Sequence, residues 1–590
     1  AGLTESQATD YAAANKEASV EAAQTALDGI VAENKRIADK KADLTAKAQT
    51  AGLNADRAKA FADSNVNTAD DAVANALTAD VAKAVTADKG GTYTGTGLTN
   101  DTKVTSQSSG YGQITTPYGT TNTSYTKTEK SVNKTYNQPY SVVVGKGTVN
   151  TTTDNYSSYN SSSTSTFKID KVAGLATLEE NLPKTGKAIY LGEAFGGLDT
   201  KGKLYYSVDF DKRIGSGAIT GWEDVFGSIE LKQGMINKIK DSQKSLIGVS
   251  SDLEGFATKI AILDVGSAKN NTIITKSSGN YTLGFYGPKG DELAGRANAF
   301  SSISIDGIEH DGNNFNIGLA AQKNDMAVET EQKLIKMAQE AGLNDSHAKI
   351  FARDNLLKEQ IGLKKALEVE GKEQASELKR EVLKRNNMSP GFSTNDRTAS
   401  FSYGNINEST VNSEGQVSVL SGYNSIYTAP YSMIISRYIT KDIKSDVNQM
   451  PNGIPKSTLD LVGFVTPNAA LPIEGKATYT GYAIKPYDYG MMYLTYNVDF
   501  TKRTGSGYLN KGDTAYYYGD KISLNTGDIT KINIKGTDVM GISSTAQSLN
   551  NIKGDYKIGF YGIEANDILG TLNMSQSEYI LGATRGDITK

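Results

Sequence analysis

Two long stretches of the chain, residues 187–323 and 476–590, consist of short segments in which apolar and polar residues alternate. In the segment 204–210 (LYYSVDF), every even-numbered side chain is apolar, and turns that contain glycine separate such segments. Alternation with a period of two is typical of β-strands, and strands joined by tight turns form antiparallel hairpins. Each stretch therefore predicts an up-and-down β-barrel of roughly eight strands, closed so that no sheet edge remains and filled by its own side chains.

Two other stretches, residues 1–89 and 324–388, contain few glycines and many good helix formers. The first relies largely on alanine for its apolar face and predicts two or three helices. We expect a break between helices at 51–54, with Gly52 as a C-cap and Asn54 as the next N-cap. The second stretch carries larger apolar residues, such as Leu334 and Leu363, and predicts a helical hairpin that packs against a domain.

Residues 90–186 and 389–475 are rich in serine, threonine, tyrosine, asparagine and glycine. This composition is compatible with a flexible stalk. The alternation at 140–144 (YSVVV) favours exposed antiparallel strands instead. We therefore expect each of these stretches to form a small β-rich subdomain, which we call the handle.

The order helical segment, handle, barrel occurs twice. Residues 208–217 (VDFDKRIGSG) return as 498–507 (VDFTKRTGSG), and 48–54 return as 338–344, in both cases 290 positions later (498 − 208 and 338 − 48). Residues 281–287 return as 556–562, at an offset of 275 (556 − 281). The sequence thus predicts a mainly β protein with helical segments, built from two tandem units of one long duplicated set of domains.

Composition excludes several classes of site. The chain has no cysteine and two histidines, His310 and His347, so disulfides, thiolate sites and histidine-rich zinc sites are ruled out. We expect His310 at the tip of a hairpin and His347 on the exposed side of a helix start, and we predict no metal site, no cofactor and no catalytic residue. A net charge of −4 without a basic run makes nucleic acid an unlikely partner, and no stretch approaches the roughly 20 apolar residues of a membrane span.

The repeated Gly-Ser-Gly at 215–217 and 505–507 superficially resembles a phosphate loop, but no Gly-Lys-Ser/Thr follows and both copies lie between strands. We interpret it as a hairpin turn whose glycines adopt positive φ. The single tryptophan, Trp222, and the nearby Phe226 follow the first copy and are the candidate partner-binding residues. For Trp222, packing in the core or closing of a loop is the alternative.

The barrel stretches resemble a known family. The first barrel matches the bacterial surface lipoprotein factor H binding protein at 182–196, 203–210, 281–287, 292–295 and 317–323. Residues 285–289 (FYGPK) are also similar to transferrin-binding protein B, which has two lobes, each a handle plus a barrel. The alanine-rich N-terminal helices depart from the family pattern, and the second barrel is the more divergent copy.

The resemblance implies a non-enzymatic protein at the outer face of the outer membrane, held by a lipid anchor upstream of Ala1, that binds a host plasma protein. The chain begins without methionine or a signal peptide, as expected for a processed or recombinant form. The leading hypothesis is recruitment of a soluble complement regulator, of the factor H or factor I type, for immune evasion. The alternatives are capture of transferrin, haemoglobin or haem for iron acquisition, and a structural adhesin.

Overall fold

The chain divides into two compact units, which we describe separately: unit 1 spans Ala1–Val328 and unit 2 spans Glu329–Lys590. The predicted fold class is confirmed, because each unit combines helices, a handle sheet and a closed antiparallel barrel of eight strands. The structure is a computed structural model, and it describes residues 2–116, 119–154, 162–197, 201–222, 228–241, 244–261, 271–305, 308–358, 360–386, 400–411, 417–444, 456–485, 491–511, 521–575 and 577–589.

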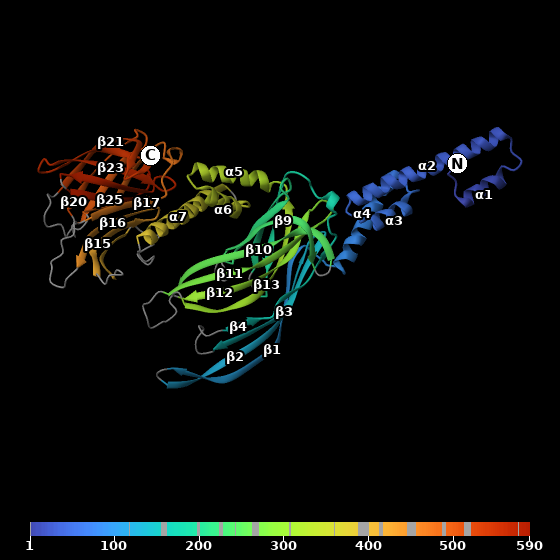
Figure 1. Ribbon diagram of the computed structural model, residues 1–590, viewed down its shortest axis with the longest axis horizontal. Coiled ribbons are helices and arrows are strands. Elements are labelled where there is room, and N and C mark those ends of the chain that lie inside the picture. Colours follow the sequence, from blue (N-terminus) through green and yellow to red (C-terminus); the bar gives the residue numbers. More distant parts are fainter. Residues whose placement is uncertain are drawn as a thin grey trace. The chain divides into compact units, whose positions relative to one another are not determined.

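Unit 1 begins with four helices, against the two or three predicted: α1 (Glu5–Ala14), α2 (Val20–Thr50), α3 (Ala55–Asn65) and α4 (Asp70–Lys89), blue in Figure 1. The predicted break is confirmed. Gly52 has a φ of 92°, and the Asn54 side chain caps α3 by accepting a hydrogen bond from the Arg57 amide at 3.0 Å. The helices pack through a small cluster that includes Leu44, Ala48 and Phe61.

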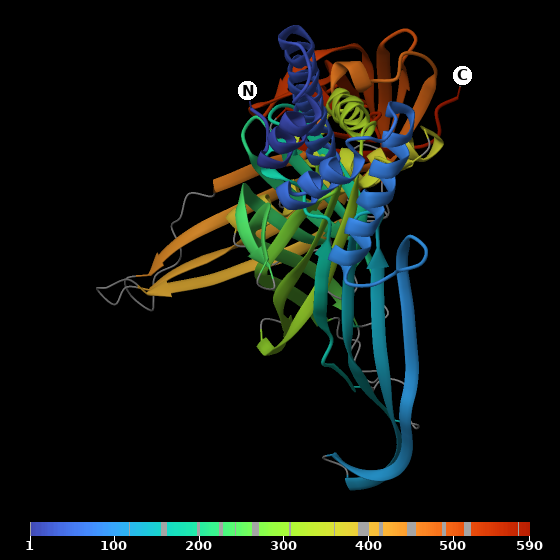
Figure 2. The same ribbon diagram turned by 90° about the vertical axis from the view of Figure 1, so that its right-hand side faces the viewer.

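The handle of unit 1 is a sheet of five strands and not an unstructured stalk. Its strands are β1 (Gly97–Thr116), β2 (Gly119–Asn137), β3 (Ser141–Asp154), β4 (Ser162–Ser165) and β5 (Lys168–Gly174), with β4 and β5 both pairing with β3. Figure 2 shows β1 and β2 continuing as a two-stranded ribbon beyond the rest of the sheet. One face of the handle packs on the outside of the barrel through Val143, Phe167 and Phe195.

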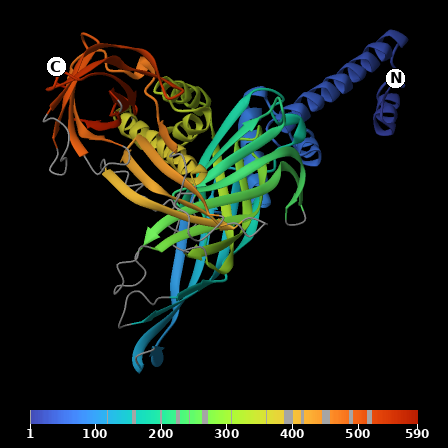
Figure 3. The same cartoon turned by 60° about the vertical axis from the view of Figure 1, so that its left-hand side comes forward.

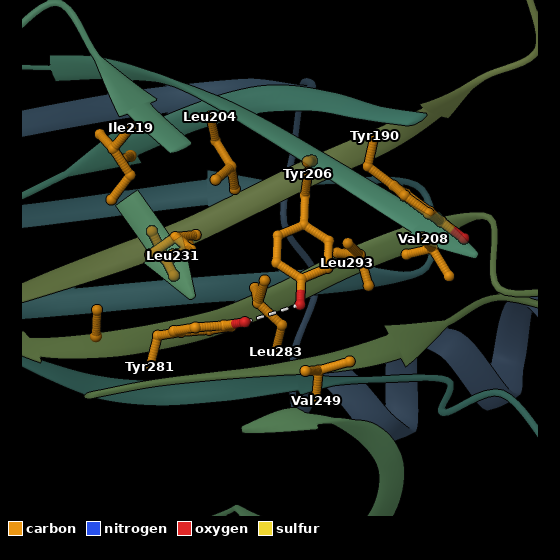
Figure 4. Packing of buried hydrophobic residues seen from close by; sticks show 14 of the residues in the cluster. Tyr190, Leu204, Tyr206, Val208, Ile219, Leu231, Val249, Tyr281, Leu283 and Leu293 are labelled. Atoms are coloured by element: carbon orange, nitrogen blue, oxygen red, sulfur yellow. Dashed lines mark hydrogen bonds between the residues drawn. The ribbon is translucent and has the colours of Figure 1, made fainter. Parts of the chain in front are cut away.

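Barrel 1 is closed by pairing of its first and last strands. Its strands are β6 (Lys187–Phe195), β7 (Lys201–Asp209), β8 (Ile214–Thr220), β9 (Ser228–Asp241), β10 (Lys244–Ala261), β11 (Asn271–Tyr286), β12 (Glu292–Ile305) and β13 (Ile308–Asn324). As the alternation predicts, the even-numbered residues of β7 face inward and are buried. In the interior, the Tyr206 hydroxyl donates to the Tyr281 hydroxyl at 3.0 Å (Figure 4). The Tyr281 hydroxyl in turn donates to the Lys232 carbonyl at 2.6 Å.

The interpretation of Gly-Ser-Gly as the hairpin turn was wrong. The turn before β8 ends at Arg213, which itself adopts positive φ (50°), as Arg503 (54°) does in unit 2. Gly215 and Gly217 lie within β8, where a Cβ atom on either would come within 2.6 Å of the Tyr206 ring. Because van der Waals contacts this short do not occur, the glycines are required to make room for the inward tyrosine.

Unit 2 repeats this plan. Its helices are α5 (Ala327–Glu340), which begins at the boundary between the units, α6 (Asp345–Asn355) and α7 (Gln360–Arg385), and its handle strands are β14 (Ser400–Val411), β15 (Val417–Ala429), β16 (Ser432–Lys444) and β17 (Lys456–Gly463). Barrel 2, seen nearly end-on in Figure 3, consists of β18 (Lys476–Ile484), β19 (Met491–Asp499), β20 (Thr504–Lys511), β21 (Lys521–Ile534), β22 (Thr537–Ser548), β23 (Lys553–Tyr561), β24 (Asp567–Met574) and β25 (Ser577–Arg585).

A buried polar junction ties helix, handle and barrel together in unit 1. The Glu292 carboxylate on β12 accepts hydrogen bonds from the Tyr140 amide (3.0 Å) and the Ser141 hydroxyl (2.7 Å) of the handle. The Lys89 ammonium at the end of α4 donates to the Asn137 side chain at 2.9 Å and to the Gln138 carbonyl. The helical segment is thus fixed to the handle at the point where the handle meets the barrel.

Unit 2 contains the same junction at the corresponding positions. Asp567 on β24 accepts from the Tyr431 amide (2.8 Å) and the Ser432 hydroxyl (3.0 Å), and Lys379 on α7 donates to the carbonyls of Ala429 and Pro430. Lys89 and Lys379 are 290 positions apart (379 − 89), which is the offset of the duplication. The helices therefore belong to the repeated unit and are not an unrelated attachment.

Candidate partner-binding site

The two barrels differ most at one end of four consecutive strands. Strands β10 to β13 contain 18, 16, 14 and 17 residues, whereas their counterparts β22 to β25 contain 12, 9, 8 and 9. Gly52 of the helical segment lies near Pro288 in the β11–β12 turn, at one end of barrel 1. The additional residues extend barrel 1 at the opposite end. We call this extension the distal rim of barrel 1.

The distal rim carries large apolar side chains on its surface. Phe256, Phe300 and Ile308 are 59%, 43% and 67% exposed, and Ile303 is also exposed. Phe256 lies opposite Lys276 of β11, and Phe300 lies opposite Ser278 two residues farther along the same strand. The two phenylalanines therefore lie on the same face of the sheet, on the two strands that flank β11.

The surroundings of these residues are polar. Lys232 on β9 forms ion pairs with Glu230 (2.8 Å) and Glu254 (3.0 Å), and Lys276 is exposed beside Phe256. Thr275 and Ser277 face the barrel interior and are buried. An apolar centre surrounded by polar groups is typical of a protein–protein interface, in which aromatic residues supply most of the binding energy.

Two further exposed apolar residues, Val104 and Tyr111, lie on the β1–β2 ribbon of the handle. The sequence analysis did not find the distal rim or these two residues. The signal that could have found the rim is the repeat offset, which falls from 290 in the first strands of the barrels to 275 at β11 and β23. The missing residues of unit 2 correspond to the extension that unit 1 has.

The sequence-based candidates lie elsewhere. Trp222 is 2% exposed and packs in the barrel core near Gly202 and Ile219, as the core-packing alternative describes. A contribution of Trp222 to partner binding stays a prediction. Phe226 lies outside the described residues, so the structure does not place it.

The two histidines behave differently from each other. His310 is exposed near the start of β13, close to the hairpin tip where we expected it. The expectation for His347 was wrong: it is buried in unit 2, with Nδ1 2.6 Å from Glu370 Oε1 and Nε2 3.0 Å from Glu377 Oε2. The two glutamates lie on α7, more than 20 positions away in sequence, so the local pattern around His347 could not reveal them.

The described residues offer little for metal or membrane chemistry. In this part of the chain, His, Asp and Glu side chains do not gather in groups of three that could hold a metal ion. Among the described helices, none has the length and hydropathy that a membrane span requires. The buried tyrosines are held neutral: burial raises the pKa of Tyr281 to about 12, although its hydrogen bond with Tyr206 lowers it.

Both barrels match the model of a known protein family. The family model described as factor H binding protein, C-terminal, matches residues 180–297 and 469–572. Both barrels are therefore similar to this family. The relation to factor H binding protein predicted from the sequence is thereby confirmed, and the first match includes the part of the distal rim that contains Phe256.

Solved structures similar to this chain include two transferrin-binding proteins B and a haemoglobin receptor. The intact Ap-TbpB with its N and C lobes is 13% identical (76% of this chain, 85% of that chain, TM-score 0.21). The isotype 1 TbpB of serogroup B Neisseria meningitidis is 14% identical (76% and 84%, TM-score 0.21). The haemoglobin receptor HpuA of Kingella denitrificans is 14% identical (33% and 85%, TM-score 0.20).

Proposed function

We propose that this chain is a non-enzymatic binding protein of the bacterial surface that captures a host plasma protein, and that the partner is a soluble complement regulator of the factor H or factor I type. The observation that carries the proposal is the match of both barrels to the factor H binding protein family. The distal rim of barrel 1 supplies a surface suited to this role.

Phe256 and Phe300 would be the energetic centre of the interface. Aromatic side chains that become fully buried at the centre of an interface typically contribute about 2 kcal/mol or more each. The ion pairs of Lys232 and the exposed Lys276 would remain at its edge, where charges affect association rate and specificity more than affinity.

The barrel favours binding because it is already ordered. Its interior is filled by a continuous cluster that includes Tyr206, Leu231 and Tyr281, all buried (Figure 4). Strands supported by such a core lose little conformational freedom when a partner binds, so less of the interaction energy is spent on ordering. This ordered core supports the strands from which the distal rim extends.

The helical arm fits attachment to a surface. α1 lies along the first half of α2, with Gln7 and Asn34 joined by hydrogen bonds of 2.6 and 3.0 Å and the Tyr11 hydroxyl donating to the Ala23 carbonyl at 2.8 Å. Because Gln7 lies beside Asn34, the part of α2 between the start of α1 and the body of unit 1 is residues 35–50, which span about 24 Å. We assign the arm the role of a spacer between a lipid anchor and the body of unit 1.

A capture experiment from host serum tests the proposal. The full chain is immobilised, serum is passed over it, and retained proteins are identified by mass spectrometry. We expect factor H or factor I to be retained specifically. Retention of transferrin or haemoglobin alone would replace complement recruitment with iron acquisition, and binding to host cells without any serum protein would indicate an adhesin.

A further inference from the structure

A second site lies in unit 1, between the handle and the outer wall of barrel 1. There the two layers border a cavity of about 260 Å³ that is open to solvent, and its lining includes Leu98, Asn100, Lys134, Tyr136, Glu193 and Lys201. It lies on β1, β2, β6 and β7, whereas the distal rim is built from β10 to β13. The cavity is therefore separate from the apolar surface assigned to partner binding.

The handle side of the cavity combines polar and apolar groups in adjacent cross-strand pairs. Asn100 pairs with Lys134, and Leu98 pairs with Tyr136. Lys134 is 3% exposed. The ring of Tyr136 stacks on Phe195 with a centroid separation of 6.5 Å and an interplanar angle of 11°, which fixes its position.

The barrel side supplies an ion pair. The Glu193 carboxylate on β6 lies 3.3 Å from the Lys201 ammonium on β7, and the Lys201 side chain is largely exposed. The cavity thus contains two cationic side chains, one carboxylate and one carboxamide.

Unit 2 shows that the fold does not need these charges. The position of Glu193 is occupied by Tyr482, three residues after the matching Tyr479, and the position of Lys201 by Met491, the first residue of β19. The strand pairing confirms that Lys201 and Met491 are equivalent positions. Phe195 pairs with Lys201 in barrel 1, and Ile484 pairs with Met491 in barrel 2.

The handle side changes in the same way. Lys134 lies five residues before Pro139, and Ser425 lies five residues before the matching Pro430. In unit 2, Tyr482 and Met491 pack with Tyr427 and Ile484 in an apolar cluster. At the positions of Lys134, Glu193 and Lys201, the described part of unit 2 therefore has uncharged side chains, whereas unit 1 has charged ones.

We propose that the cavity of unit 1 binds a small hydroxylated organic anion of monosaccharide size, that is, a sugar acid. The ammonium groups of Lys134 and Lys201 would hold its carboxylate, and Asn100 and Glu193 would bond its hydroxyl groups. Leu98 would contact the apolar side of its ring. The cavity, of about 260 Å³, is large enough to admit a molecule of this size.

The test is a titration of the full chain with glucuronate, followed by ligand-observed NMR and calorimetry, with glucose, acetate and inorganic phosphate as comparison probes. We expect saturable binding of glucuronate, at least about tenfold tighter than that of each comparison probe. Substitution Lys201→Met should weaken glucuronate binding by about tenfold. The matched control Lys276→Met, an exposed lysine of the distal rim, should leave it unchanged.

A triple variant, Lys134→Ser with Glu193→Tyr and Lys201→Met, converts the seam to the residues of unit 2 and should abolish glucuronate binding while keeping the melting temperature. If the triple variant does not fold, Lys201→Met alone decides, because that side chain is largely exposed. Three results would each overturn the proposal. They are no glucuronate binding up to about 20 mM, equal binding of glucose or phosphate, and glucuronate binding that is unchanged in Lys201→Met.

Discussion

His347 and Arg57 occupy the same position in the two helical segments, 290 residues apart (347 − 57), and each amide is bound by the capping asparagine before it. Arg57 holds Asp88 through two hydrogen bonds of 2.7 and 2.9 Å. His347 lies between Glu370 and Glu377, and its ring can donate to both only when it is protonated. One copy thus uses a permanent cation and the other a titratable one.

The contacts of His347 make the stability of unit 2 depend on pH. Burial alone would lower the pKa of His347, but the hydrogen bonds to Glu370 and Glu377 outweigh it and raise the pKa. Asp354 and Glu373 add negative charge near Glu370. A raised histidine pKa contributes stability that is complete below the unfolded value of about 6.5 and is lost as pH rises through the folded value.

We therefore predict that the unfolding free energy of unit 2 falls as pH rises through the folded pKa of His347. His347→Arg should flatten this dependence, since arginine keeps its charge. Thermal unfolding across a pH series measures the effect. In NMR, the imidazole signal that persists in a His310→Gln variant should titrate above the ordinary histidine range. Equal pH slopes for the wild type and His347→Arg would refute the assignment.

The buried carboxyl groups of the two junctions, Glu292 and Asp567, also make folding stability depend on pH. Burial raises the pKa of Glu292 to about 7, against the opposing hydrogen bonds from Ser141 and Tyr140 and the charge of Lys89. The counterpart Asp567 is raised to about 6 for the same reason. For a carboxyl with a raised pKa, the stabilising contribution is complete below about 4.5 and is lost as pH rises through about 7.

The substitution Glu292→Gln should remove this pH-dependent contribution to the stability of unit 1. We expect the stability of the wild type to decrease relative to the variant by about 2–4 kcal/mol between pH 5 and pH 8. Denaturant unfolding at several pH values gives the difference directly. A constant difference between the two proteins over this range would show that Glu292 does not titrate there.

At the scale of elements, the glycines of β8 test how the barrel hairpin is built. Gly217→Ala would place a Cβ atom 2.3 Å from the Tyr205 carbonyl oxygen, so the strand or Tyr206 must shift. We expect a loss of about 2 kcal/mol or more in the stability of unit 1. Gly29→Ala in α2 is the control: its Cβ meets open space, and the change should stabilise the helix by up to about 1 kcal/mol. A Gly217→Ala protein as stable as the wild type would contradict this account.

The period-two alternation was sufficient to predict both barrels because the side chains of each strand truly alternate between core and outside. The Gly-Ser-Gly motif misled because glycine has two uses, positive φ and the absence of a Cβ atom, and the local sequence does not separate them. The turn residue proved to be Arg213 and Arg503, which propensity disfavours at positive φ. The rim residues Phe256 and Phe300 were missed because alternation does not reveal where a strand leaves the core.

At the scale of the whole molecule, the duplication allows each unit to serve as the control for the other. The junctions at Glu292 and Asp567 and the tyrosine pairs at Tyr206 and Tyr496 are retained in both. The distal rim and the charged cavity occur in the described part of unit 1, and the corresponding regions of unit 2 are shorter or apolar. Shared features thus belong to the scaffold, and we assign binding to the features that differ.

The central claim is that the distal rim of barrel 1 captures the host protein. The most direct test is the binding of the serum partner to the full chain and to a triple rim variant, Phe256→Ser with Phe300→Ser and Ile308→Ser. The control is Leu549→Ser with Ile552→Ser, which removes exposed apolar residues from barrel 2. We predict that the rim variant binds at least about a hundredfold more weakly, at an unchanged melting temperature, while the control binds as the wild type does. Unchanged affinity of the rim variant would contradict the account.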